Sequence, residues 1–357
     1  MQLAPLPATI DRRNWGDALD LDRTGFFFRQ HACDRKTVWK INLSPPLDRH
    51  VILCGMKLPI VHHPAYDVTT IPDDHRFPMR KFARLARQLV ASDFADRLAW
   101  HEPEAAPVAA VERAHDPAYV ADILRQRLDD KAARRIGFPI TPAVANRSLL
   151  STGGTMLAGR LALEHGAAAN TAGGSHHAAR GHGAGFCVFN DVAIAALDLL
   201  EANTVARVLV FDCDVHQGDG TAQIFAADPR VFTCSIHCEA NWPLEKPPSD
   251  LDVGLPKDAD DAAYLDVLLP ALALSIDRAR PDIVFYNAGV DPHASDRLGK
   301  LALTDDGLRA RDLHLAQTCR RLGIPLTAVI GGGYGEDRDA VAARHLILFE
   351  AMAKTFT

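Results

Sequence analysis

Two aspartates and a histidine at alternate positions are the clearest indication of chemistry in this sequence. Asp212, Asp214 and His216 come directly after the apolar run 207–211. On an extended segment, alternate side chains point to the same side. Two carboxylates and an imidazole at the end of a buried strand would be costly without a compensating charge. A divalent cation would supply that charge, so the segment predicts a metal site.

A third acidic residue follows another apolar run and could complete that site. Asp291 comes after the run 282–286 through Asn287-Ala288-Gly289-Val290. An Asp/His/Asp set leaves one coordination position open, as catalytic zinc requires. Taken alone, Asp291-Pro292 would be interpreted as the start of a turn.

The adjacent histidines His176 and His177 lie in a glycine-rich segment. Neighbouring histidines can serve as a general base and its electrostatic partner when their environments push their pKa values apart. Each ring needs an acceptor to orient it. Asp212 and Asp219 are the candidates, because both belong to the same DCDVHQGDG stretch.

Two glycine-rich segments could supply the remaining parts of an active site. The segment 331–335 reads GGGYG, and its phenol, Tyr334, is suited to donate to a developing oxyanion. It is not a dinucleotide loop, because Glu336 stands where the third glycine of GxGxxG would be. In the segment 181–187, Gly185 and Phe186 would form an apolar wall.

The elements that must position these residues alternate along the chain. We expect helices over 155–165, with Gly166 as its stop, and over 191–202. The continuous apolar runs between helices predict strands buried on both faces: 207–211, 231–236, 282–286 and 326–330. The predicted fold is α/β, a single domain with a central, mostly parallel sheet flanked by helices on both faces. Ligands of such sheets bind beyond the carboxyl ends of the strands, where the polar residues lie.

Composition limits the classes of function. The 357 residues are 48% hydrophobic and 7% aromatic and carry a net charge of -6, without the basic face of a nucleic-acid binder. Seven scattered cysteines without a CxxC pair favour a reducing compartment. We expect no membrane span or secretory signal and a cytoplasmic location. Residues 1–55 lack a sustained period, so we expect an N-terminal extension, or else an irregular layer packed on a catalytic domain over 56–357.

Five segments occur in an order that resembles the zinc-dependent histone deacetylase family, within the wider arginase/deacetylase fold. They are GGSHHA, GAGFCVFNDVAIA, DCDVHQGDG, NAGVDP and GGGYG, and the resemblance covers residues 58–350. The segments LPIVHHPAY, STGGTMLAGRLALEHG and NAGVDPHASDRLGKL look most like the class IV branch, in a bacterial-type homologue.

The resemblance implies two ion sites. Asp214, His216 and Asp291 would hold the catalytic zinc ion. Asp212 and Ser235 match a structural potassium site of the family, which is formed mainly by backbone carbonyls.

The resemblance also implies catalytic roles. His177 would be the general base that activates the zinc-bound water, and His176 its electrostatic partner or acid. Asp212 would orient His176, and Asp219 would orient His177. Tyr334 would donate a hydrogen bond to the tetrahedral oxyanion.

The substrate tunnel is where this sequence departs from the family. Gly185 and Phe186 match one wall, but the phenylalanine pair of many members is missing from the stretch 235–243. We expect Trp242 to form the opposite wall. The acid that grips the substrate backbone at the rim in class I enzymes has no recognisable counterpart.

The predicted function is therefore hydrolysis of acetyl or longer acyl groups from lysine side chains in proteins or peptides. One alternative is the same chemistry on a small acylated amine, such as an acetylpolyamine. Another is an arginase-like binuclear hydrolase, because His293 follows Asp291 by two residues. A third, an inactive acyl-lysine binding module, is disfavoured because His177 and Tyr334 are both present. Acyl-chain length and oligomeric state stay open.

Overall fold

The computed structural model describes residues 57–357, which are built around one sheet of eight strands. The sheet order is β2-β1-β3-β8-β7-β4-β5-β6, and every neighbouring pair is parallel. The strands are β1 (Leu58–Val61), β2 (Leu98–His101), β3 (Ala167–Asn170), β4 (Val208–Asp212), β5 (Val231–Cys238), β6 (Leu251–Leu255), β7 (Ile283–Asn287) and β8 (Leu326–Val329). The four predicted strands are all present, with ends shifted by one or two residues, and the predicted α/β fold is confirmed.

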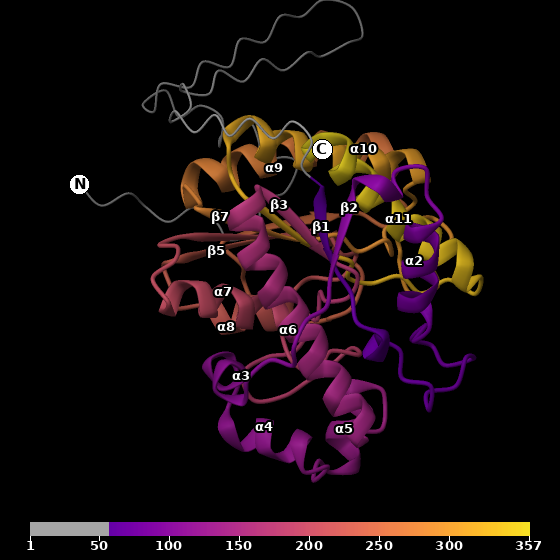
Figure 1. Cartoon of the computed structure of the whole chain (residues 1–357), viewed down its shortest axis with the longest axis vertical. Helices are drawn as coiled ribbons and strands as arrows, with labels where there is room; N and C mark the ends of the chain where they lie inside the picture. Colours follow the sequence, from indigo (N-terminus) through magenta and orange to yellow (C-terminus); the bar gives the residue numbers. More distant parts are fainter. Residues whose placement is uncertain (1–56) are drawn as a thin grey trace, which may run out of the picture.

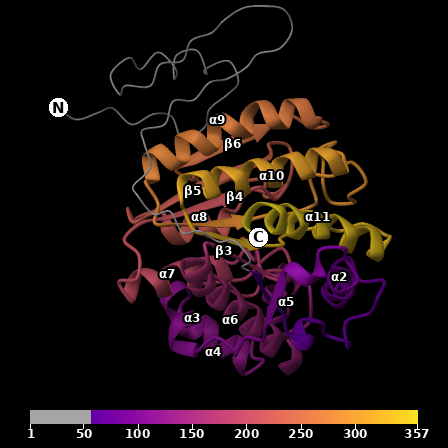
Figure 2. The same ribbon diagram turned by 45° about the horizontal axis from the view of Figure 1, so that its top comes forward.

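Helices cover both faces of the sheet (Figures 1 and 2). One face carries α2 (Lys81–Val90), α9 (Asp261–Ala279), α10 (Asp305–Leu322) and α11 (Arg338–Phe356). The other carries α6 (Pro142–His165), α7 (Asp191–Glu201) and α8 (Asp219–Phe225), with α3 (Val108–Ala114), α4 (Pro117–Leu124) and α5 (Asp130–Ile136) beyond them.

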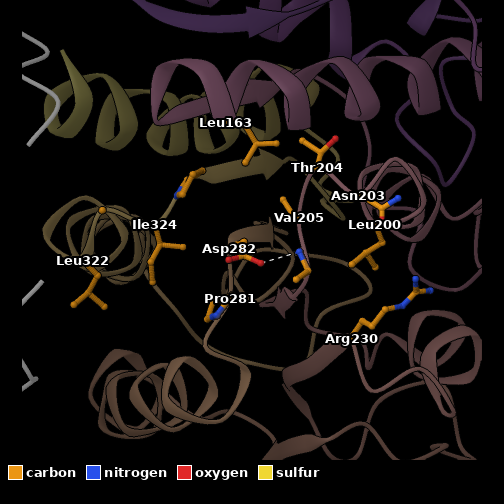
Figure 3. A pocket seen from close by; sticks show the side chains of 13 residues that line it. Leu163, Leu200, Asn203, Thr204, Val205, Arg230, Pro281, Asp282, Leu322 and Ile324 are labelled. Carbon is orange, nitrogen blue, oxygen red and sulfur yellow. Dashed lines mark hydrogen bonds between the residues drawn. The ribbon is translucent and has the colours of Figure 1, made fainter. Parts of the chain in front are cut away.

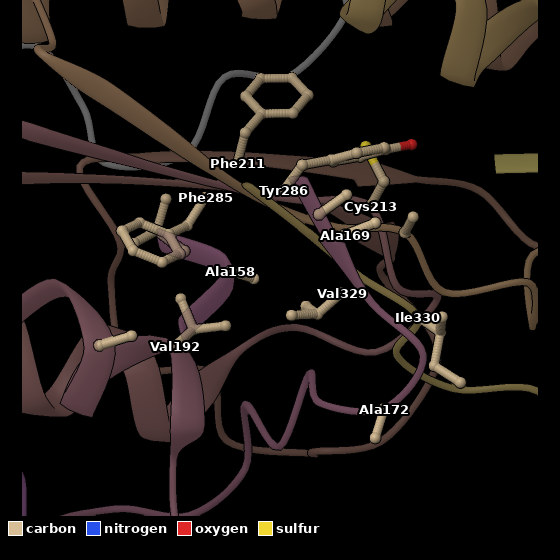
Figure 4. Packing of buried hydrophobic residues seen from close by; sticks show 14 of the residues in the cluster. Ala158, Ala169, Ala172, Val192, Phe211, Cys213, Phe285, Tyr286, Val329 and Ile330 are labelled. Carbon is tan, nitrogen blue, oxygen red and sulfur yellow. The ribbon is translucent and has the colours of Figure 1, made fainter. Parts of the chain in front are cut away.

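The central strands are apolar on both faces because both faces are covered. Every residue of β4 and β7 is buried. Phe211 and Tyr286 from these strands lie close together, and Phe285 packs near Val192 of α7 (Figure 4). Burying one large apolar side chain contributes about 1.5–3 kcal/mol. The continuous apolar runs seen in the sequence are therefore the requirement of a parallel sheet with two covered faces.

The long helix α6 differs from its prediction. It begins at Pro142, with the Thr141 side chain accepting a hydrogen bond from the backbone N–H of Val144, and it includes Gly153 and Gly154, which precede the expected start. The expected start at residue 155 was therefore wrong, although the end at His165 was right. A side chain at Gly153 would overlap the carbonyl oxygen of Glu104. The glycine is there for close packing, not to end the helix.

Two neighbouring polar residues have different roles at the start of α7. The Asn190 side chain accepts a hydrogen bond from the backbone N–H of Ala193 and is the cap. Asp191 is the first helical residue, and its side chain turns instead to the loop after β3. The helix itself was predicted correctly.

A surface pocket lies at the amino ends of β4, β7 and β8, away from the strand ends that carry the chemistry (Figure 3). Asp282 and Arg230 are the charged residues that line it. Asp282 accepts hydrogen bonds from the backbone N–H groups of Ala206 and Arg207. Arg230 is paired with Asp228 and Glu201. Both charged residues of this pocket are therefore already engaged in interactions within the protein.

Two further expectations concern the termini and the membrane. The interpretation of residues 1–55 as an extension lies outside the described residues. Within 57–357, no helix is both long and apolar enough to cross a bilayer. The five cysteines of this range are buried and free.

Replacement of Gly153 by alanine tests the packing of α6. We expect the free energy of unfolding of Gly153→Ala to fall by about 1–3 kcal/mol, because the methyl group overlaps backbone that cannot rotate away. Gly159→Ala is the control in the same helix, where the added carbon would lie 3.3 Å or more from its neighbours. Urea unfolding of both variants measures the difference, and equal stabilities would contradict this account.

Candidate functional site

The carboxyl ends of four neighbouring strands bring the predicted site residues together. The two histidines follow β3, Asp214 and His216 follow β4, Asp291 follows β7, and Tyr334 follows β8. These strands are adjacent in the order β3-β8-β7-β4. Residues separated by more than 150 positions in the chain thus meet at one edge of the sheet.

Asp214, His216 and Asp291 converge on one point. Their nearest ligand atoms all lie within 4.8 Å of one another, and all three residues are buried. His216 Nδ1 lies 3.0 Å from Asp214 Oδ1 and 3.3 Å from Asp291 Oδ2. This is the one group of its kind among residues 57–357. The two carboxylates and the imidazole predicted from the sequence therefore form a single cluster that could bind a metal ion.

The electrostatics of this cluster fit a bound cation. Asp291 Oδ2 is buried and has no hydrogen-bond partner among the described residues. Burial, together with the neighbouring Asp214 carboxylate, raises the pKa of Asp291 to about 7. Two carboxylates whose nearest oxygens lie within 4.8 Å of each other in a buried site need a compensating positive charge. The oxygen and nitrogen donors are also those that zinc accepts.

The backbone around the cluster holds the carboxylates in place. Asp214 Oδ2 accepts a hydrogen bond from the backbone N–H of Gly332 at 2.8 Å, and its Oδ1 accepts one from that of His216 at 3.0 Å. Asp291 Oδ1 accepts one from Val215 at 2.9 Å. The loops after β4, β7 and β8 are therefore tied together through the candidate metal ligands themselves.

Asp212 does not share the side of Asp214 and His216, as the alternating pattern alone had suggested. Strand β4 ends at Asp212, so the pattern of an extended chain does not continue beyond it. Asp212 Oδ2 instead lies 2.7 Å from His176 Nδ1. The segment thus divides between two partners: Asp212 faces His176, and the next two polar residues face the candidate metal position.

The tandem histidines have separate acidic partners, as predicted. His177 Nδ1 lies 2.6 Å from Asp219 Oδ1, while His176 is bonded to Asp212. The two rings are buried, with centroids 4.0 Å apart. Each Nδ1 is engaged from behind, which leaves each Nε2 to face the site.

The environments of the two histidines push their pKa values apart. For His177, burial and the neighbouring His176 lower the pKa to about 4. For His176, burial acts in the same direction, but the Asp212 and Asp214 carboxylates outweigh it and raise the pKa to about 9. These opposite shifts favour a neutral His177 ring and a charged His176 ring near neutral pH. His177 is therefore the group able to accept a proton.

Tyr334 is fixed by its backbone and by its ring. Its N–H donates to Asp296 Oδ2 at 2.6 Å. Its ring centroid lies 5.8 Å from that of Phe186 and 6.3 Å from that of His216. The phenol is thus held beside the candidate metal ligands.

Trp242, the residue expected to form the second wall, packs against His177. Its ring centroid is 4.4 Å from that of His177. The loop that carries Trp242 is held by Lys246, whose Nζ donates to the carbonyls of Glu239, Asn241 and Pro243 at 2.7–3.0 Å. A carbon atom added at Gly185 would lie 3.0 Å from the Trp242 ring, so these two residues are close neighbours.

Sequence reasoning missed several polar residues that support the site. Asp191 accepts hydrogen bonds from the backbone of Gly174 and Ser175, just before the histidines. Asn287 Nδ2 donates to Asp212 Oδ1 at 3.0 Å. Position alone was a usable signal for Asn287, because it ends a buried strand.

Two buried cations were also missed, because a lone basic residue in a helix resembles a solvated one in sequence. Lys81 is 1% exposed, and its Nζ donates to the Gly331 carbonyl at 2.8 Å and lies 6.0 Å from the centre of the Tyr334 ring. Arg311 of α10 is completely buried and contacts the carbonyls of Cys213 and Gly289.

Comparison with known proteins agrees with this geometry. The histone deacetylase domain matches residues 75–349. An uncharacterized protein of Picosynechococcus sp. is 47% identical over 296 residues, which is 83% of this chain and 98% of that protein. Histone deacetylase 2 of Arabidopsis thaliana is 29% identical over 298 residues, 80% of this chain and 77% of its own length. Histone deacetylase RPD3 of Saccharomyces cerevisiae is 34% identical over 197 residues, 51% of this chain and 44% of its own. The chain belongs to the histone deacetylase family.

Proposed function

We propose that this member of the deacetylase family is a zinc-dependent deacylase that removes acetyl or longer acyl groups from lysine side chains. One observation carries the proposal. A buried Asp/His/Asp cluster lies beside His177, which is neutral at physiological pH and oriented by Asp219. A nucleophile-activating base beside a metal position is what amide hydrolysis requires.

Asp214, His216 and Asp291 would hold the zinc ion. When bound, the metal would supply Lewis acidity that polarises an acyl carbonyl and makes water more acidic. Three protein ligands leave a position free for substrate or water.

The two histidines would move the protons of the reaction. His177 Nε2 accepts the proton of the attacking water, and Asp219 stabilises the charged ring that results. His176 is already charged and lies with its Nε2 3.7 Å from Asp214 Oδ1. It therefore acts as the electrostatic partner, or as the acid that serves the departing amine. Asp212 holds the ring in place for either role.

Tyr334 would donate its hydroxyl hydrogen to the oxygen of the scissile carbonyl as negative charge develops there. Burial and the Asp214 and Asp291 carboxylates raise the pKa of this phenol well above its usual value, so the proton stays available for donation. One such donor is worth about two to three orders of magnitude in rate.

The substrate would enter between aromatic walls. Phe186, which packs beside Tyr334, and Trp242, which packs beside His177, would form these walls, and Gly185 lets Trp242 approach closely. Such walls suit the aliphatic stem of an acylated lysine. Trp242 and Leu244 are 40% and 90% exposed, so this side of the entrance offers apolar surface to a peptide.

We also propose a branch of the family, a domain boundary, a location and a second ion site for this chain. We place the chain in the class IV branch and its catalytic domain at 56–357, with no nucleic-acid partner and a cytoplasmic location. Asp212 pairs with Ser235 between β4 and β5, as a structural potassium site near both residues would require. Ser235 Oγ also lies 3.0 Å from His237 Nδ1.

Deacylation of a small acylated amine is the second candidate, since the same catalytic groups would serve it. An arginase-like binuclear site has less support. His293 Nδ1 lies 2.9 Å from Ser295 Oγ, and its Nε2 lies 3.3 Å from Asp305. His293 is not part of the Asp214–His216–Asp291 cluster.

Loss of one ligand should abolish metal binding. We expect wild-type protein to hold one equivalent of zinc and Asp214→Ala to hold almost none, as measured by elemental analysis after gel filtration. His293→Ala is the control and should keep one equivalent. Two equivalents in the wild type and one in His293→Ala would instead support the binuclear alternative.

Removal of the base or the phenol should stop turnover without releasing metal. We expect His177→Ala and Tyr334→Phe each to lower kcat for an acyl-lysine peptide at least about a hundredfold. Tyr119→Phe is the matched control. It removes another buried phenol hydroxyl, which donates to the Val188 carbonyl and has no role in the proposed reaction. Near-normal activity in either test variant, with zinc retained, would show that its role is assigned wrongly.

Substrate class can be decided with a panel of acyl-lysine peptides of increasing chain length and N-acetylputrescine, each with and without a chelator. We expect kcat/KM to favour a peptide, and the chelator to remove the activity. Efficient turnover of the polyamine alone would replace acyl-lysine by a small acylated amine.

A further inference from the structure

A buried guanidinium group lies next to the segments that carry the candidate metal ligands. Arg311 belongs to α10 and is 0% exposed, and the adjacent Asp312 is 2% exposed. No step proposed above uses either residue. Burial of a charged pair at this depth costs several kcal/mol per ion before its interactions are counted, so its contacts must offset that cost.

Arg311 joins the two strand ends that lead into the acidic metal ligands. Its Nη1 donates to the Gly289 carbonyl at 2.6 Å and lies 3.3 Å from the Cys213 carbonyl. Cys213 directly precedes Asp214, and Gly289 stands two residues before Asp291. One nitrogen atom therefore bridges the backbones of both ligand-bearing segments.

The bridge lies where the sheet can no longer hold these segments together. Strands β4 and β7 are paired through their last residues, Asp212 and Asn287. The Cys213 N–H still donates to the Asn287 carbonyl at 3.0 Å, and beyond that bond no backbone–backbone hydrogen bond joins these two described segments. Beyond it, the two segments are joined by the hydrogen bond from the Val215 N–H to Asp291 Oδ1 and by the contacts of Arg311 with both backbones.

Gly289 packs directly against the carboxylates of both acidic ligands. A carbon atom added at Gly289 would lie 2.7 Å from Asp214 Oδ2 and 2.9 Å from Asp291 Oδ1. The carbonyl that Arg311 holds thus belongs to a residue whose Cα packs against both carboxylates. A shift of that carbonyl would move the carboxylates with it.

Arg311 is itself held in one geometry. Its Nε donates to Asp312 Oδ1 at 2.9 Å, and the Tyr286 hydroxyl donates to the same oxygen at 2.5 Å. Burial lowers the pKa of Arg311, but Asp312 outweighs burial and raises it well above the usual value, so the group stays charged. Tyr286 belongs to β7, so the anchor and the bridge are attached to the same strand.

We propose that Arg311, anchored by Asp312, is a positioning residue that sets the spacing of Asp214 and Asp291 and thereby tunes their hold on the metal ion. The inference rests on the proposed function, in which these aspartates are ligands. The competing account is that Arg311 only attaches α10 to the sheet. The two accounts differ in metal affinity and ligand geometry, because attachment of a helix would change stability alone.

The test compares Arg311→Met and Arg311→Lys with Leu315→Ala in the full-length protein. Leu315 is a buried residue of α10 one turn further on, so its truncation weakens the same helix without touching either carbonyl. The measurements are the zinc dissociation constant by chelator competition, the visible absorption of the cobalt-substituted protein, and thermal unfolding of the metal-free protein.

We expect Arg311→Met to weaken zinc binding about ten- to a hundredfold, as loss of outer partners of metal ligands does, and to change the cobalt spectrum. Arg311→Lys keeps the charge but not the planar fork, and should fall between Arg311→Met and wild type. Leu315→Ala should lower the unfolding temperature and leave affinity and spectrum unchanged.

Three results would overturn the inference. The first is an unchanged zinc affinity and cobalt spectrum in Arg311→Met. If Arg311→Met does not fold, the same result in Arg311→Lys would count instead. Leu315→Ala could weaken zinc binding as much as Arg311→Met, which would reduce Arg311 to an attachment of α10. If wild-type protein bound no zinc, the proposed function would fail together with this inference, whereas tight binding by wild type and by the arginine variants would contradict the inference alone.

Discussion

Two buried carboxylates point at the same imidazole nitrogen, and this arrangement is costly unless a cation joins it. Asp214 and Asp291 both lie within 3.3 Å of His216 Nδ1, and all three side chains are buried. Much of the surrounding structure holds this cluster in place. Backbone N–H groups of Val215 and Gly332 reach the carboxylates directly. Arg311 contacts the carbonyls of Cys213 and Gly289, in the segments that lead into Asp214 and Asp291.

The same constraint explains why the two histidines differ. His176 lies between the Asp212 and Asp214 carboxylates, whose charges hold its proton. His177 stands one residue further on, where burial and the neighbouring His176 lower its pKa more than its partner Asp219 raises it. Adjacent residues of one type therefore acquire opposite protonation states from their surroundings, as general acid–base pairs commonly do.

Much of the fold could be predicted because a parallel sheet with two covered faces requires continuous apolar strands. Strands β4, β5, β7 and β8 were recognisable for that reason, and the polar residues after them marked the edge that carries the site. The predicted start of the helix that contains Gly153 was wrong. This glycine is required by close packing against the backbone of Glu104, which is distant in sequence. A local sequence pattern can indicate how closely a residue is packed only when residues near it in the chain form the contact.

The sequence alone was enough to identify the order of motifs, the sheet class and the side chains able to bind metal, because ligand type and strand pattern are local properties. Only the tertiary structure separated Asp212 from Asp214 and gave each histidine its own acid. It also revealed Lys81, Asp191 and Arg311 as parts of the site, although each looks like an ordinary helix residue in the chain. Their roles come from contacts across as many as 250 residues. Such contacts exist only once the strands have brought their carboxyl ends to one edge.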